Sequence, residues 1–129
     1  MKEPVWLIKS AVVAVHNMMI ARFGGADGIR DEGLIDSALA RPANIYHYDR
    51  RTDVSQLAAA YAAGIIQNHP FVDGNKRTGF MAAYMFLDLN GATLHADEVT
   101  ATAMTLSLAT SEIDEKDYAN WLAENIGTT

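Results

Sequence analysis

Hydrophobic residues recur along most of this chain at spacings of three and four, the period of helices that bury one face. Ser10 is the expected N-cap of the first helix, which Gly24-Gly25 ends, and Asn90-Gly91 ends the fourth. The pattern predicts an all-α fold, a helical bundle of about six helices, in one domain spanning residues 1–129. The predicted helices cover residues 10–23, 31 to just before Pro42, 54 or 55 to 68, 75–89, 97–109 and 114–126.

Two segments depart from the helical period. Residues 42–53 lack it, and Ile45-Tyr46-His47-Tyr48 alternates as an extended strand does, which predicts a small mobile β flap. Residues 93–96 are expected to form a short extended link. Residues 80–87 are apolar almost all round, so the fourth helix is expected at the centre of the domain.

Composition and charge narrow the functional classes. The chain has no cysteine, which excludes disulfides and thiolate chemistry and fits the cytoplasm, and neither a secretory signal nor a membrane span is expected. The net charge is -6, with 9 basic and 8 acidic residues up to Arg77 but 1 basic and 8 acidic after it. This balance argues against direct nucleic-acid binding. The acidic part either faces a basic protein partner or is simply a solvated surface.

The main chemical signal is the segment 69–79, which reads HPFVDGNKRTG and joins the third and fourth predicted helices. Pro70 disfavours helical geometry in the residue before it, so the third helix should end close to His69 and present its imidazole at the loop. A neutral imidazole can accept the proton of an attacking hydroxyl. Phe71 should point into the core and anchor the loop.

The second half of the segment suits a phosphate. Gly74 permits a tight turn, and the free amides at the start of the next helix, with Lys76 and Arg77, form an anion pocket. Asp73 is a hard oxygen ligand suited to a Mg²⁺ that is shared with phosphates, so we expect a Mg-nucleotide such as ATP. Each residue alone could also be only a cap, a turn former or a surface charge, as for Asn75.

The remaining histidines, His16, His47 and His95, are expected to be structural or solvated, and no paired-ligand spacing indicates zinc.

The segment from His69 to Arg77 resembles the signature HxFx[DE][GA]N[GK]RxxR of the Fic/Doc family, and residues 24–42 resemble the N-terminal region of its small Doc branch. The resemblance covers nearly the whole chain and implies a Fic/Doc-type helical bundle. It also implies that His69 is the catalytic base, that Asp73 holds Mg²⁺, and that Gly74, Asn75 and Arg77 bind the phosphates of ATP.

Two departures from the signature favour one of the family's chemistries. Lys76 stands where AMP-transferring members usually have glycine, and Phe80 stands where they have a second arginine. Both match Doc-like toxins, which implies phosphoryl transfer to a protein hydroxyl, with Lys76 among the catalytic and phosphate-binding residues. AMP transfer and a catalytically inactive antitoxin-binding module remain the alternatives.

The resemblance also implies partners. Doc-like toxins act on elongation factor Tu and so inhibit translation, and a Phd-like antitoxin restrains them. The inhibitory pattern [ST]xxxE[GN] of self-restrained members has no full match. Ser111 and Glu115 have the right spacing, but Lys116 stands where the pattern requires glycine or asparagine. Glu124-Asn125 fits the end of the pattern, but Asn120 stands where it requires serine or threonine. A separate antitoxin chain is therefore expected.

Overall fold

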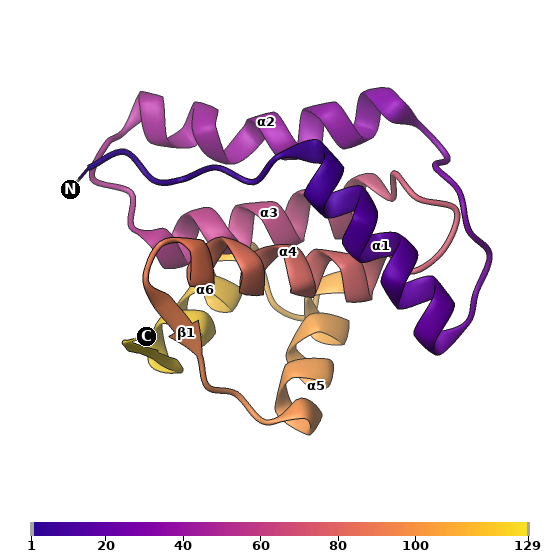
Figure 1. The fold of residues 1–129 in the computed structure, drawn as a ribbon. Coiled ribbons are helices and arrows are strands. Elements are labelled where there is room, and N and C mark those ends of the chain that lie inside the picture. Colours follow the sequence, from indigo (N-terminus) through magenta and orange to yellow (C-terminus); the bar gives the residue numbers. More distant parts are fainter. Residues whose placement is uncertain (1, 129) are drawn as a thin grey trace.

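The computed structural model describes residues 2–128, which form six α-helices and a small antiparallel sheet (Figure 1). The all-α class with about six helices is confirmed, and none of the helices in this range is long and apolar enough to cross a membrane. The elements are α1 (Lys9–Phe23), α2 (Glu32–Tyr48), α3 (Val54–Asn68), α4 (Asn75–Leu89), β1 (Ala92–Leu94), α5 (Glu98–Ala109), α6 (Glu115–Glu124) and β2 (Ile126–Thr128).

The centre of the fold is α3, not α4 as expected from the sequence. Every α3 residue from Leu57 to Ile66 is buried, and α3 packs against α2, α4 and α6 (Figure 1). Its alanines allow close helix approach. Two glycines mark the crossings: a Cβ on Gly64 would lie 3.3 Å from that of Ala38, and one on Gly79 would lie 2.8 Å from Cγ1 of Ile66. The helix α4 is instead buried on one face only.

The prediction that the second helix ends before Pro42 is wrong, and so is the predicted β flap at residues 45–48. The helix α2 continues through Pro42 to Tyr48. Its buried residues, Ile35, Ala38, Pro42 and Tyr46, keep helical spacing and form a single face. A proline inside a helix costs about 3 kcal/mol, but continuing the helix buries Tyr46, whose ring packs 5.7 Å from that of Trp6. Tertiary packing therefore outweighs the local preference.

The small sheet lies elsewhere. β1 pairs antiparallel with β2, in a register that sets Ala92 opposite Thr128 and Leu94 opposite Ile126. The expected link at 93–96 thus begins inside a strand. The sixth helix ends at Glu124 rather than at 126, because the side chain of Asn125 bonds back to the Trp121 carbonyl (2.8 Å) and Ile126 joins the sheet.

Local hydrogen bonds fix where the helices begin. The expected N-cap at Ser10 is wrong, since α1 begins at Lys9 with Ile8 as its N-cap. By contrast, α2, α3, α5 and α6 each begin after an aspartate whose carboxylate accepts an amide of the first turn: Asp31, Asp53, Asp97 and Asp114. These caps offset the positive ends of the helices.

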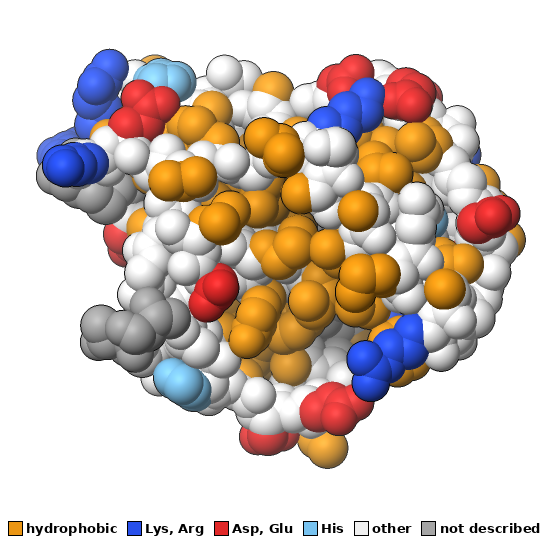
Figure 2. Space-filling view, viewed as in Figure 1, with side chains coloured by type: hydrophobic (Ala, Val, Ile, Leu, Met, Phe, Trp, Pro, Cys, Tyr) orange, Lys and Arg blue, Asp and Glu red, His pale blue; other side chains and the backbone are white. Residues whose placement is uncertain are grey.

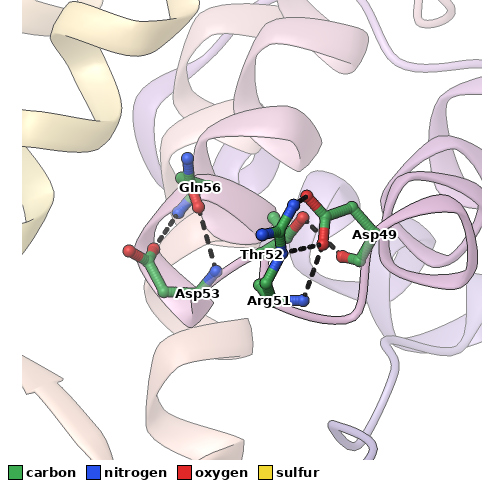
Figure 3. A network of polar contacts seen from close by, with 5 residues as sticks. All are labelled: Asp49, Arg51, Thr52, Asp53 and Gln56. Atoms are coloured by element: carbon green, nitrogen blue, oxygen red, sulfur yellow. Dashed lines mark hydrogen bonds and ion pairs between the residues drawn. The ribbon is translucent and has the colours of Figure 1, made fainter.

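The connection between α2 and α3 is ordered by such bonds (Figure 3). Asp49 accepts from the Arg51 backbone and guanidinium (both 3.0 Å), and the hydrogen bond from the Arg51 side chain lowers the pKa of its carboxyl. The Thr52 hydroxyl donates to the Asp49 carbonyl (2.7 Å). Asp53 and Gln56 form a capping box, each side chain accepting the other's amide at 2.9 Å.

We expect Asp53→Ala to lower the free energy of unfolding by about 1 kcal/mol, because the capping box at the start of the central helix is lost. Urea denaturation followed by circular dichroism measures this. Asp53→Ser keeps an N-cap oxygen and should recover most of the loss. Equal losses in the two variants would contradict the role of the cap.

Candidate active site

The candidate site is the loop between α3 and α4, and its first residue ends α3. His69 is the C-cap of α3, in a left-handed backbone conformation with φ 53° and ψ 54° that is uncommon for a residue other than glycine. Its amide donates to the Ile65 carbonyl at 3.1 Å. The predicted end of the third helix is confirmed. The imidazole is exposed and lines a groove.

Arg30 holds this helix end from the outside. Its Nε donates to the His69 carbonyl (2.7 Å) and a terminal nitrogen to the Asn68 carbonyl (2.9 Å), so a cation covers the negative end of α3. The amides of Arg30 and Asp31 donate to the Pro70 carbonyl at 2.7 and 3.0 Å. The backbone that carries the imidazole is therefore fixed on the side away from the groove.

Phe71 is wholly buried and closes the loop on itself. Its amide donates to Oδ1 of Asn75, and its carbonyl accepts from Nδ2 of Asn75, both at 3.0 Å. Both polar atoms of the Asn75 side chain are thus used within the loop. An anion at the start of α4 would therefore be bound by backbone amides rather than by this side chain. On the outside, Phe71 forms a β-bridge with Ile29, and the Val72 amide donates to the Gly28 carbonyl at 3.1 Å.

The turn at Asp73 and Gly74 is held between α1 and the groove. The Asp73 carbonyl lies 2.7 Å from Nε2 of His16, whereas its carboxylate accepts the Gly74 amide at 2.8 Å. The second carboxylate oxygen lies beside Gly25, where an added Cβ would come within 2.7 Å of it. The Gly24-Gly25 pair therefore does more than end α1, because it makes room for the carboxylate.

Two cations follow at the start of α4. Lys76 and Arg77 are exposed in its first turn, where the helix dipole is also positive. The Arg77 guanidinium lies 4.7 Å from the centre of the Phe23 ring, which orients it by a cation–π contact. An anion would offset this concentration of positive charge.

These groups share one groove of about 860 Å³. Figure 2 shows this face hollowed between α4 and α5, with hydrophobic side chains over α4. The groove therefore joins a polar end to an apolar trough. The polar end is lined by His69, Asp73, Gly74, Asn75, Lys76 and Arg77, and the mainly apolar walls include Phe80, Met81 and Tyr84 of α4 and Ala101 and Leu106 of α5, with Glu98 at the start of α5.

The donor set suits a magnesium ion that is shared with phosphates. Among residues 2–128 no three histidine, aspartate or glutamate side chains converge as a metal cage would require. Mg²⁺ usually binds one or two carboxylates and takes its other ligands from phosphates and water. The Asp73 carboxylate, exposed in the groove, fits that mode.

Sequence reasoning missed three residues that support the loop: His16, Gly25 and Arg30. His16 was expected to be structural or solvated, and it is buried, but its contact with the motif loop was not foreseen. The sequence offered only a spacing, since His16 follows Val12 by one helical turn, and the structure shows that these two are the buried residues of α1. His47 lies 3.9 Å from the Glu3 carboxylate and His95 lies against Gly127, and neither histidine lines the groove.

Comparisons with known proteins show the family of this chain. The Fic/DOC family profile matches residues 6–87. The chain is 42% identical over 104 residues to "Toxin Doc" of Mycolicibacterium smegmatis, covering 78% of this chain and 80% of that protein. It is 31% identical over 117 residues to "Protein kinase doc" of Escherichia phage P1, covering 91% and 92% of the two. The chain therefore belongs to the Fic/DOC family, and its similar relatives are Doc proteins.

Proposed function

We propose that this protein is a toxin that transfers a phosphoryl group from ATP to a hydroxyl of a target protein and thereby arrests growth. The observation that carries the proposal is the meeting, in one groove, of an imidazole at the end of α3 with the carboxylate, amides and cations at the start of α4. The names of the two relatives, one a toxin and one a protein kinase, support the same class.

In this proposal His69 is the general base. Its imidazole is exposed at the groove, so a hydroxyl of a large substrate can reach it. The imidazole accepts the proton as that oxygen attacks the γ-phosphorus of ATP, and the bond from this phosphorus to the bridging oxygen breaks and releases ADP. The carbonyl contacts of Arg30 keep the backbone below the ring in place. Such positioning is a large part of what a phosphotransfer enzyme supplies.

The start of α4 receives the triphosphate in this proposal. Backbone amides from Asn75 onward, the helix dipole, Lys76 and Arg77 supply donors and positive charge, whereas the Gly74 amide is already bonded to the Asp73 carboxylate. Mg²⁺, when bound at Asp73, neutralises part of the phosphate charge. The Asn75 side chain contributes indirectly, because it holds the Phe71 backbone.

Phosphoryl transfer is preferred to AMP transfer because of Lys76 and Phe80. Both line the groove, at positions where AMP-transferring members carry glycine and a second arginine. A lysine there crowds and charges the space that the AMP-transfer pose would use. The preference concerns which phosphate faces His69, so labelled nucleotide can test it.

We further propose that the partners are a Phd-like antitoxin and a translation factor such as elongation factor Tu, that the protein acts in the cytoplasm, and that it does not bind nucleic acid directly. The support is the word toxin in the name of one relative, the acidic balance of the chain beyond Arg77 and the resemblance to Doc. Relief of growth arrest by co-expressing the cognate antitoxin would test the first of these.

Incubation of the purified protein with elongation factor Tu, or with lysate, and ATP labelled separately at the α and γ positions tests the reaction. We expect protein-bound label from γ-labelled ATP alone, and none when magnesium is chelated. Label from α-labelled ATP alone would establish AMP transfer instead. No label from either nucleotide would favour an inactive antitoxin-binding module.

His69→Ala should abolish growth arrest and lower the transfer rate by about 10²–10⁴-fold, because the proton acceptor is lost. Growth curves after induction and single-turnover transfer measure this. His47→Ala, which removes an exposed histidine outside the groove, is the matched control and should behave as wild type. Arrest that persists in His69→Ala would contradict catalysis by this imidazole.

Gly25→Ala should displace the Asp73 carboxylate and raise the magnesium concentration needed for half-maximal transfer by about tenfold or more. The added methyl would lie 2.7 Å from the carboxylate oxygen. Gly24→Ala is the control, since it also places alanine at positive φ but meets no atom within 4 Å of the new methyl. Equal magnesium dependence in the two variants would rule out the steric effect on Asp73.

A further inference from the structure

We infer that His16 is a positioning residue, which fixes the peptide between Asp73 and Gly74 so that the Gly74 amide faces the groove. Nothing in the family signature covers this residue, which lies on α1 and far from the motif in sequence. The catalytic consequence of the inference rests on the proposed function. The orientation of the peptide does not, and it can be measured separately.

The ring of His16 is held tightly enough to act as a support. It is 1% exposed, and it stacks on the Phe71 ring with centroids 3.8 Å apart and planes 8° apart. Phe71 is itself fixed through both of its backbone bonds to Asn75. The imidazole plane is thus set by the motif loop, and its Nε2 reaches the Asp73 carbonyl at 2.7 Å.

The direction of that carbonyl determines the direction of the next amide. In a trans peptide the C=O and the following N–H point in opposite directions. With the Asp73 carbonyl drawn towards α1, the Gly74 amide points the other way, where it donates to the groove-lining carboxylate of Asp73 at 2.8 Å. One imidazole therefore orients both an amide donor and the proposed magnesium ligand.

The turn needs such a support because its second residue is glycine. Gly74 has φ 78°, and glycine adopts negative φ about as readily, so the peptide before it can flip at little cost. A flipped peptide would turn the Asp73 carbonyl oxygen into the groove and repel a phosphate there. A larger residue at position 74 is a poor remedy, because it would be strained at this positive φ and its Cβ would lie 3.1 Å from the Ile20 side chain.

The test uses His16→Gln and His16→Met, which are similar in length and flexibility. The Nε2 donor of glutamine is as many bonds from Cβ as that of histidine, whereas methionine has no N–H. If the buried site needs only packing, the methionine variant should resemble wild type more closely than the glutamine variant. If the site needs a hydrogen-bond donor to the Asp73 carbonyl, the glutamine variant should resemble it more closely. Both variants are compared with wild type by thermal unfolding, by the amide NMR resonance of Gly74 and by phosphoryl-transfer kinetics.

We expect glutamine to keep the temperature coefficient of the wild-type Gly74 amide resonance, which reports the hydrogen bond of that amide, and a kcat within about threefold of wild type. Methionine should change that coefficient and lower kcat by about a hundredfold, even if it is the more stable variant. A methionine variant with unchanged temperature coefficient and kcat overturns the inference. If wild-type protein transfers no phosphate, the proposed function fails, and the Gly74 temperature coefficients of the two variants alone decide whether His16 orients the peptide.

One measurement on wild-type protein covers the case in which neither variant folds. The ¹⁵N resonances of the imidazole report which ring nitrogen carries the proton. We expect Nε2 to carry it, since this nitrogen must donate to the Asp73 carbonyl. A ring protonated on Nδ1 alone overturns the inference.

Discussion

The close contact between α3 and α4 determines where the groups of the candidate site lie. The two helices touch at Gly79, which lies one turn into α4 and packs on Ile66 and on the carbonyl of Ala62. Ile66 lies two residues before the last residue of α3, and Gly79 lies four residues after the first residue of α4. A side chain at Gly79 would push the helices apart, because its Cβ would lie 2.8 Å from Ile66 and 3.1 Å from the Ala62 carbonyl, and the two ends that share the groove would then be displaced from each other.

Electrostatics at the two helix ends complement this packing. The end of α3 is negative and the start of α4 is positive, so bringing them together concentrates opposite partial charges around one loop. Arg30 covers the carbonyls of α3 on the outer side, and Lys76 and Arg77 add charge to α4 on the groove side. Positive charge therefore gathers at the start of α4, although Asp73 and Glu98 also line the groove and the chain as a whole carries a charge of -6.

The sequence predicted those features that depend on nearby residues. The bounds of α3 and α4 follow from Asp53, Pro70 and Gly74, which act on their immediate neighbours. The C-terminal end of α2 could not be predicted this way. The preference of proline to end a helix is local, whereas the burial of Tyr46, which favours continuing the helix, depends on packing against Trp6. The β1–β2 pairing likewise joins segments that are distant in sequence, and neither shows a strong strand pattern alone.

The same distinction applies to the candidate site. The residues at its polar end all fall within the short segment from His69 to Arg77, which could be interpreted from the sequence as one chemical unit. The residues that support them come from α1 and from the loop after it, where His16, Gly25 and Arg30 have no mutual spacing that indicates a role. Long-range support of this kind depends on tertiary structure, which a single sequence does not contain.

The stacking of His16 on Phe71 has an evolutionary consequence. Two rings 3.8 Å apart in a closed space cannot change size independently, and the space beside Gly74 is filled by the same imidazole. Substitution at one of these positions would select for compensating changes at the others. In homologous proteins the residues at positions 16, 71 and 74 should therefore covary. A motif loop transferred alone to another helical scaffold would lack the packing that His16 supplies.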